Sequence, residues 1–293
     1  MSELAASGGD EVPAGVMTVA LVQMNSGADR DANVAKAVGM IDEAVRDHGA
    51  DVVVLPEFFN VEYVFMQYDR TLVRLAERDN GPSMAAVRTA AIEHRVHIIA
   101  TILEEHSPGH IFDTAIVLGP DGEIKGKYRK THPAATESLE KLFFRYGAHF
   151  DAIPLGSWNV GINICYDNEL PESARCSALA GADLIVAPFA TPLQMPLREM
   201  LIARASDNQL FLAACNKVGS EGGLQFCGMS MIIDPLGEVL AIASDSEEQV
   251  LSAEVDRRVM LRARQERPLY RDRRPDLYAA IVMAAEDLPA RAS

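Results

Sequence analysis

The sequence predicts an α/β fold in which helices cover mixed β-sheets. Short apolar runs rich in β-branched residues alternate with segments whose apolar residues recur every three or four positions, as in amphipathic helices. Most of these runs are continuous rather than alternating, which is typical of strands buried on both faces. A Pro-Asp-Gly motif at 120–122 and an Asp-Pro-Leu-Gly motif at 234–237 indicate hairpins, and therefore some antiparallel pairing.

The first half of the chain begins with a strand, a helix and a strand, an order that predicts parallel pairing between the strands. In the first helix, Val34, Ala37 and Ile41 fall on one face, and His48-Gly49 marks its end. The expected strands are Met17–Met24, Asp51–Leu55, Val96–Leu103 and the two arms of a hairpin over Ala115–Tyr128. The expected helices are Val34–Val45 and Pro82–Arg95.

The second half repeats this order of elements. The expected strands are Asn159–Cys165, Ala182–Pro188, Leu210–Cys215 and the arms of the hairpin around 234–237. The expected helices are Pro171–Gly181, which has proline at its favoured first position, Leu197–Asn208 and Asp256–Glu266. No linker is longer than an ordinary loop, so we expect residues 16–293 to form one domain. Residues 1–15, acidic and rich in small residues, are expected to form a flexible N-terminal tail.

Composition narrows the functional classes. With 293 residues, 48% of them hydrophobic, the chain can bury a large core without metals or disulfides. Its 27 basic and 42 acidic residues give a net charge of −15, which repels phosphate backbones and anionic lipid surfaces, so we expect neither a nucleic-acid nor a membrane partner. No apolar run reaches the roughly 18 residues of a membrane-spanning helix. The start of the chain lacks a secretion signal, and the four cysteines lack Cys-x-x-Cys spacing, which favours a reducing cytoplasm and disfavours disulfides or zinc.

Three polar residues lie where apolar segments end. Glu57 follows one expected strand, Cys165 ends another, and Lys130 follows the first hairpin. Taken singly they are ordinary: a capping or ion-pairing glutamate, a buried inert thiol and a solvated lysine. Together they are a base, a cation and a nucleophile, a set suited to acyl chemistry. A neighbouring cation lowers the pKa of a thiol, and a carboxylate can accept its proton.

A catalytic Cys-His pair is the competing hypothesis. His94 and His97 lie at a predicted helix–strand join, so only His132, close to Lys130 in sequence, is a candidate for the site. The other thiols are interpreted as structural, namely Cys176, Cys215 and Cys227.

The segments around these residues resemble the signatures of the nitrilase superfamily, the carbon-nitrogen hydrolases. VVVLPEFF contains Glu57, GKYRKTHP contains Lys130 and NICYDNELPESAR contains Cys165, in the family's order and across nearly the whole chain. Glu140 in LEKLFF, NKVG at 216–219 and RRPDLY at 273–278 are also similar to the family. Three matches in order are much more specific than any one of them.

The resemblance implies a four-layer αββα sandwich with mixed sheets, commonly associated through a two-fold interface into a homodimer or a larger homo-oligomer. It implies that Cys165 is the nucleophile, Glu57 the general base and later acid, and Lys130 the cation that stabilises the tetrahedral oxyanion. Glu140 would orient the lysine and the substrate. The backbone N–H of Tyr166 would be a second oxyanion donor, a kind of group worth about 2.7 to 4 kcal/mol. No metal and no organic cofactor is implied.

The expected substrate is a small amide or an N-carbamoyl amine, because several segments most resemble N-carbamoyl amine and N-carbamoyl amino acid hydrolases. Where carbamoyl D-amino acid enzymes carry arginines, this sequence has Asn168 and Glu169, which favours a neutral or cationic substrate. Glu169 either faces a substrate ammonium group or is a helix N-terminal glutamate favoured by the macrodipole. The full set of expected substrate contacts is Tyr166, Phe58, Tyr63, His132, Glu169 and Thr191.

Two alternatives stay open. One is a true nitrilase that converts a nitrile to an acid, and the other is a non-catalytic interaction protein that keeps the fold as an assembly module. Retention of all three reactive residues favours an enzyme. Arg175 resembles a structural arginine of the family and is left out of the expected site.

Overall fold

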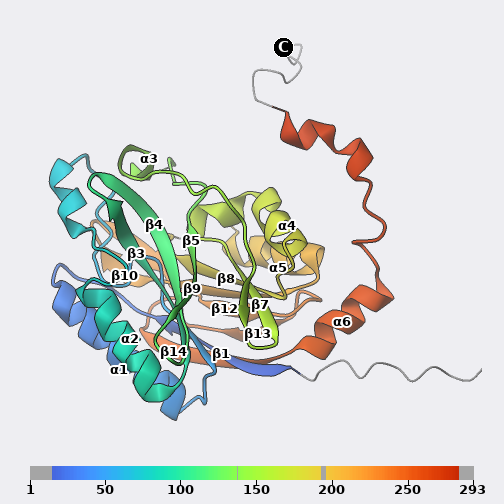
Figure 1. Cartoon of the computed structure of the whole chain (residues 1–293), viewed down its shortest axis with the longest axis horizontal. Helices are drawn as coiled ribbons and strands as arrows, with labels where there is room; N and C mark the ends of the chain where they lie inside the picture. The colour runs from blue at the N-terminus through green and yellow to red at the C-terminus, as the bar shows by residue number, and fades with distance from the viewer. Residues whose placement is uncertain (1–14, 137, 193–195, 284–293) are drawn as a thin grey trace, which may run out of the picture.

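The computed structural model describes residues 15–136, 138–192 and 196–283. Two six-stranded sheets lie face to face with helices packed on their outer faces, which confirms the layered αββα sandwich (Figure 1). The tail expected over residues 1–15 lies outside the described residues, except for Gly15. No helix in the described ranges is long and apolar enough to cross a membrane.

The first sheet has the strand order β14-β1-β2-β3-β4-β5. β1 pairs with β2 and β2 with β3 in parallel, which confirms the pairing predicted from the order of the elements. The other neighbours are antiparallel. The strands are β1 (Val16–Gln23), β2 (Val52–Val54), β3 (His97–Ser107), β4 (His110–Leu118), β5 (Ile124–Arg129) and β14 (Gln249–Asp256).

The second sheet has the strand order β13-β12-β9-β8-β7-β6. Its centre is parallel, from β7 through β8 to β9, and its edges are antiparallel. The strands are β6 (Ile153–Leu155), β7 (Trp158–Ile162), β8 (Leu184–Phe189), β9 (Phe211–Asn216), β12 (Met231–Ile233) and β13 (Val239–Ile242). A separate two-stranded ribbon consists of β10 (Val218–Glu221) and β11 (Leu224–Cys227).

Helices cover the outer faces of both sheets. α1 begins at the N-cap Asp29, whose carboxylate accepts the backbone N–H groups of Asp31 and Ala32, and its Ala37 and Ile41 pack on the first sheet. The helices are α1 (Arg30–Arg46), α2 (Pro82–His94), α3 (Glu140–Phe143), α4 (Pro171–Leu179), α5 (Leu197–Asn208) and α6 (Arg257–Glu266). The 3-10 turns are η1 (Arg70–Leu75), η2 (Cys165–Glu169), η3 (Pro275–Leu277) and η4 (Ala279–Val282).

The central core lies between the two sheets. Leu21 and Val54 of the first sheet meet Ile162 and Val186 of the second, all essentially fully buried. The central strands of both sheets are thus apolar on both faces, which explains why they are continuous apolar runs in the sequence.

The structure differs from the expected elements in a few places. The strand expected over Asn159–Cys165 ends at Ile162, and Cys165 instead begins η2 with a left-handed φ of +43°. Strands β6, β10, β11 and β14 were not expected. β14 pairs with β1 along its whole length. The polar residues of β14 prevented its recognition as a strand from the sequence.

Candidate active site

The loops that carry the three candidate catalytic residues meet at the seam between the two sheets. Glu57 follows β2 and Lys130 follows β5, both in the first sheet, whereas Cys165 follows β7 in the second. The Glu57 N–H donates to the carbonyl oxygen of Phe189 at the end of β8, at 3.3 Å, and so links the two sheets directly. The site is therefore a product of the face-to-face packing of the sheets.

Lys130 lies at the centre of a buried charge cluster. Its Nζ donates to Glu57 Oε1 at 2.6 Å and to Glu140 Oε2 at 2.7 Å, and it lies 3.4 Å from Asp113 Oδ2. All four side chains are essentially inaccessible to solvent. Ligand oxygens of the three carboxylates lie within 4.8 Å of one another, close enough to hold a metal ion. The lysine ammonium, however, already takes the place of a cation among them.

The local backbone explains how Glu57 and Lys130 are held. Thr101 Oγ1 accepts the Phe58 N–H and donates to the Pro56 carbonyl, which fixes the turn on both sides of Glu57. The Lys130 carbonyl accepts the N–H of Gly147 at 2.8 Å. A Cβ at Gly147 would lie 1.9 Å from the Arg129 carbonyl oxygen, so this close approach requires glycine.

Burial controls the charge states of these groups. Burial raises the pKa of Glu57, and the nearby Lys130 charge opposes it only in part. Burial lowers the pKa of Lys130, but the charges of Glu140 and Glu57 outweigh it, so the pKa lies well above its ordinary value and the ammonium persists. Burial also raises the pKa of the Cys165 thiol, and the Glu57 charge raises it further, against the opposing effect of Lys130. Cys165 therefore rests as a thiol and needs a base.

A cavity of about 260 Å³ opens in front of Cys165. Of the expected contacts, Tyr63, Tyr166, Glu169 and Thr191 line it, together with Cys165 and Glu140. The other lining residues are Ala134, Thr136, Ser138, Ala190, Pro192 and Leu224.

Comparison with known proteins agrees with this arrangement. The sequence model described as carbon-nitrogen hydrolase matches residues 18–265. The chain belongs to the carbon-nitrogen hydrolase family. A nitrilase from Pyrococcus abyssi is 37% identical to it over 267 residues, which are 90% of this chain and 99% of the relative. An omega-amidase from Homo sapiens is 32% identical over 274 residues, which are 89% of this chain and 96% of the relative. The structure of a carbon-nitrogen hydrolase from Helicobacter pylori G27 superimposes with a TM-score of 0.87 at 28% identity, covering 92% of this chain and 99% of that one.

This carbon-nitrogen hydrolase is thus an enzyme. Two of its expected substrate contacts lie outside the cavity. Phe58 has a φ of +53° and is fully buried, with its ring 5.2 Å from that of Phe65 and 5.8 Å from that of Phe144. The Nδ1 of His132 lies 2.9 Å from Asp167 Oδ1. These two residues support the walls of the site rather than face the cavity.

Contacts that the sequence did not predict support the site of the hydrolase. The Tyr63 hydroxyl donates to Glu140 Oε1 at 3.0 Å and lies 2.9 Å from Ser138 Oγ. Asn168 is buried, and its Nδ2 donates to the carbonyls of Asn163 and Cys165. These hydrogen bonds stabilise the turn η2, which carries the Cys165 thiol. These contacts join residues that are distant in sequence or lie within one turn. No spacing pattern in the sequence therefore predicts them.

A buried ion pair holds the loop after β2. Lys217 Nζ donates to Glu221 Oε2 at 2.7 Å and to the Val61 carbonyl at 3.1 Å. Glu221 also accepts the N–H groups of Ser26 at 2.6 Å and Tyr63 at 3.0 Å. Because the same loop contains Glu57 and Tyr63, this ion pair helps to fix the position of the candidate catalytic residues.

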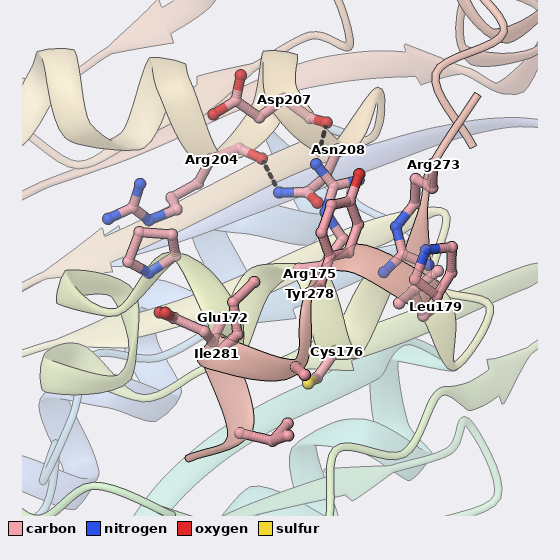
Figure 2. Close-up of a pocket in the computed structure, with 14 residues that line it drawn as sticks. Glu172, Arg175, Cys176, Leu179, Arg204, Asp207, Asn208, Arg273, Tyr278 and Ile281 are labelled. Carbon is pink, nitrogen blue, oxygen red and sulfur yellow. Dashed lines mark hydrogen bonds between the residues drawn. The ribbon is translucent and has the colours of Figure 1, made fainter. Parts of the chain in front are cut away.

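A second cavity of the hydrolase, of about 420 Å³, lies between α4, α5 and the C-terminal segment 273–282. Figure 2 shows Arg175 donating to the carbonyl of Asp207 and Asn208 donating to that of Arg204 at its wall. None of the candidate catalytic residues lines this cavity. Arg175 belongs to this wall, as expected for a residue outside the site. Among the other thiols, Cys176 is exposed here, while Cys215 and Cys227 are buried.

Proposed function

We propose that this amidase hydrolyses a small neutral or cationic amide or N-carbamoyl amine, with Cys165 as nucleophile, Glu57 as general base and Lys130 as the oxyanion cation. One observation carries the proposal. Lys130 Nζ lies 2.6 Å from Glu57 and 2.7 Å from Glu140, while Glu140 and Cys165 line the same cavity. Through Glu140, the pair of Lys130 and Glu57 adjoins the cavity that Cys165 lines, which supports a nucleophile, a base and a cation acting on one substrate carbonyl.

Acylation begins when Glu57 accepts the thiol proton of Cys165 as the sulfur attacks the substrate carbonyl carbon. The raised pKa of the thiol makes this base necessary. The Lys130 ammonium and the Tyr166 N–H stabilise the oxyanion. The C–N bond then breaks as Glu57 returns the proton to the leaving nitrogen. An amide releases ammonia, and an acyl thioester remains on Cys165.

Deacylation uses the same groups. Glu57 accepts a proton from water as the water oxygen attacks the thioester carbonyl carbon. The C–S bond breaks, the thiolate recovers the proton from Glu57, and the acid leaves. For an N-carbamoyl amine the released carbamic acid decomposes to the amine and carbon dioxide. Glu140, which Tyr63 and Lys130 hold by hydrogen bonds, keeps the lysine oriented through both steps.

The charge of the cavity supports a neutral or cationic substrate. Glu140 and Glu169 line it, and no lysine, arginine or histidine is among its lining residues in the described part of the chain. Glu140 is already paired with Lys130, so Glu169 is the lining carboxylate that has no ion-pair partner among the described residues. Burial raises the pKa of Glu169, against the effect of Lys130, and a substrate ammonium group would offset that burial. The small volume favours a short substrate.

The test is a panel of N-carbamoyl compounds of equal length that end in methyl, ammonium or carboxylate, with the corresponding amides and nitriles. Ammonia release is measured for the wild type, Cys165→Ala and the matched thiol control Cys176→Ala. We expect turnover of amides or carbamoyl amines in the order ammonium, methyl, carboxylate, loss of turnover in Cys165→Ala only, and slower or no conversion of nitriles. Preference for the carboxylate, or activity in Cys165→Ala, would contradict the proposal. Faster conversion of nitriles would favour a nitrilase, the activity for which the Pyrococcus abyssi relative is named.

We also propose that the chain associates at least into a homodimer. Three apolar residues that line the second cavity are exposed: Val282 by 85%, Ile281 by 60% and Leu179 by 48%. A second copy would cover this apolar area. Light scattering of the purified protein tests this, and a monomeric mass at micromolar concentration would contradict it.

A further inference from the structure

Asp113 is a third carboxylate at the catalytic lysine. It lies in β4, is 1% exposed, and its carbonyl accepts the Lys130 N–H at 2.9 Å. The pairing of Thr114 with Arg129 sets this register. As a result Asp113 Oδ2 lies 3.4 Å from Lys130 Nζ, on the ammonium that the two glutamates also contact.

The buried charges of this cluster do not balance if every group is ionised. Three carboxylates and one ammonium leave two uncompensated negative charges in a site without solvent access, which is costly. At least one carboxyl group therefore holds a proton. Glu140 is not that group, because it accepts hydrogen bonds from Lys130 Nζ, the Tyr63 hydroxyl and the Ala134 N–H.

The hydrogen bonds point to the pair formed by Asp113 and Glu57. Both Asp113 carboxyl oxygens and Glu57 Oε2 have no donor among the described residues when both groups are ionised. A proton on Asp113 supplies the missing donor, because its O–H then hydrogen-bonds to Glu57 and satisfies one oxygen of each residue. Glu57 Oε1, at 2.6 Å from Lys130 Nζ, is the better ion-pair partner, so the negative charge belongs on Glu57.

The electrostatics agree with this assignment. Burial raises the pKa of Asp113 well above its ordinary value, and its hydrogen bond with Glu57 raises it further while lowering the pKa of Glu57. The titratable groups that face this pair are Lys130 after β5, Glu140 on α3, Tyr63 in the loop after β2 and Cys165 on η2.

We propose that Asp113 is a positioning residue of the active site, a neutral carboxylic acid that donates a hydrogen bond to Glu57 and holds it ionised and oriented for its work as a base. The inference rests on the proposed role of Glu57. Asp113 touches neither substrate nor nucleophile and acts only through Glu57. Its proton is not consumed in the reaction.

Two substitutions separate this role from a structural one. Asp113→Leu keeps the branched skeleton of the side chain and has no donor, whereas Asp113→Asn keeps an N–H that can donate to Glu57. In Asp113→Leu we expect the acid limb of the kcat/KM profile to move to higher pH by about 1 to 2 units, because Glu57 loses one hydrogen bond to its charged form. The rate on that limb falls about tenfold per unit. Asp113→Asn should restore the limb and recover part of the lost rate. Asp183→Asn, a buried aspartate just before β8, is the matched control and should leave the profile in place.

A second readout does not depend on turnover. The infrared spectrum of the folded protein should contain the C=O band of a protonated carboxylic acid that disappears in Asp113→Asn and persists in Asp183→Asn. The pH dependence of Cys165 alkylation by iodoacetamide, followed by mass spectrometry in a Cys176→Ala background, should shift in Asp113→Leu as the acid limb does. Wild-type protein that turns over no amide but shows this band and shift would refute the proposed function and leave the Asp113 inference standing.

The contrary outcomes are equally definite. If Asp113 is ionised, Asp113→Asn removes a negative charge beside Glu57, lowers its pKa and moves the acid limb to lower pH. That shift, or an unchanged profile in an Asp113→Leu variant that unfolds at the wild-type temperature, would overturn the inference. If Asp113→Leu does not fold, the infrared band in Asp113→Asn decides: its persistence overturns the inference, and its loss supports it.

Discussion

Replacement of Lys217 by methionine removes one charge of the buried pair that braces the loop after β2. The wild-type Nζ is fully buried, 2.7 Å from Glu221 Oε2 and 3.1 Å from the Val61 carbonyl. In the variant the Glu221 carboxylate stays buried without its cation, and the Val61 carbonyl loses a donor. Breaking a buried pair from one side costs about 3 to 5 kcal/mol. The N–H groups of Ser26 and Tyr63 still bind Glu221, so we expect a loss at the lower end of that range.

Urea unfolding followed by the fluorescence of Trp158, the single tryptophan of the chain and a core residue, measures this free energy of unfolding. Lys125→Met, which breaks the half-exposed pair with Asp121, is the matched control and should cost at most about 1 kcal/mol. The double variant Lys217→Met/Glu221→Gln should be less destabilised than the sum of the single variants, because no unpaired charge remains. A Lys217→Met loss no larger than that of Lys125→Met would refute this reasoning.

Three further predictions concern acid stability, backbone packing and the catalytic base. Burial raises the pKa of Glu104, but hydrogen bonds from Arg129 and Lys127 outweigh it and lower this pKa to about 2. The ionised Glu104 therefore stabilises the fold above pH 4.5, and this stabilisation is lost as the pH falls through about 2. Acid unfolding followed by circular dichroism should be less steep in Glu104→Gln than in the wild type, and an equally steep transition would contradict this. Gly147→Ala should lower the free energy of unfolding in urea by about 1 to 3 kcal/mol or more, and should lower kcat, because the added Cβ would lie 1.9 Å from the Arg129 carbonyl oxygen. Wild-type values of the unfolding free energy and of kcat would argue against this contact. Because burial raises the pKa of Glu57, the acid limb of the wild-type kcat/KM profile should lie above pH 4.5. Glu57→Gln should lower kcat by about 10² to 10⁴, and a near-normal rate would show that Glu57 is not the general base.

Most of the architecture could be predicted from the sequence because both faces of the central strands are buried. Continuous apolar runs such as the one that contains β8 are a direct consequence of that burial. β14 escaped prediction because its outer residues are polar and it pairs only at an edge of the sheet. Its partner, β1, lies more than two hundred residues away in the sequence.

The convergence of Glu57, Lys130 and Cys165 was also expected, because all three follow strands. Their charge states were harder to predict. The sequence places a cation near the thiol, which lowers a thiol pKa, yet burial and the Glu57 charge raise that of Cys165 further than Lys130 lowers it. Asp113 could not be expected at all, since it lies within a strand and its importance depends on the register of β4 against β5.

The hydrogen bond from Glu57 to the Phe189 carbonyl joins the two halves of the chain at the point where the chemistry takes place. Each half carries only part of the proposed catalytic set: the N-terminal half holds Glu57 and Lys130, and the C-terminal half holds Cys165. We therefore expect the catalytic rate to depend strongly on how the two halves are aligned. In a chimera that takes one half from a relative, β14 of the C-terminal half must still pair with β1 of the N-terminal half, and we expect turnover only when the two halves pack in the native alignment.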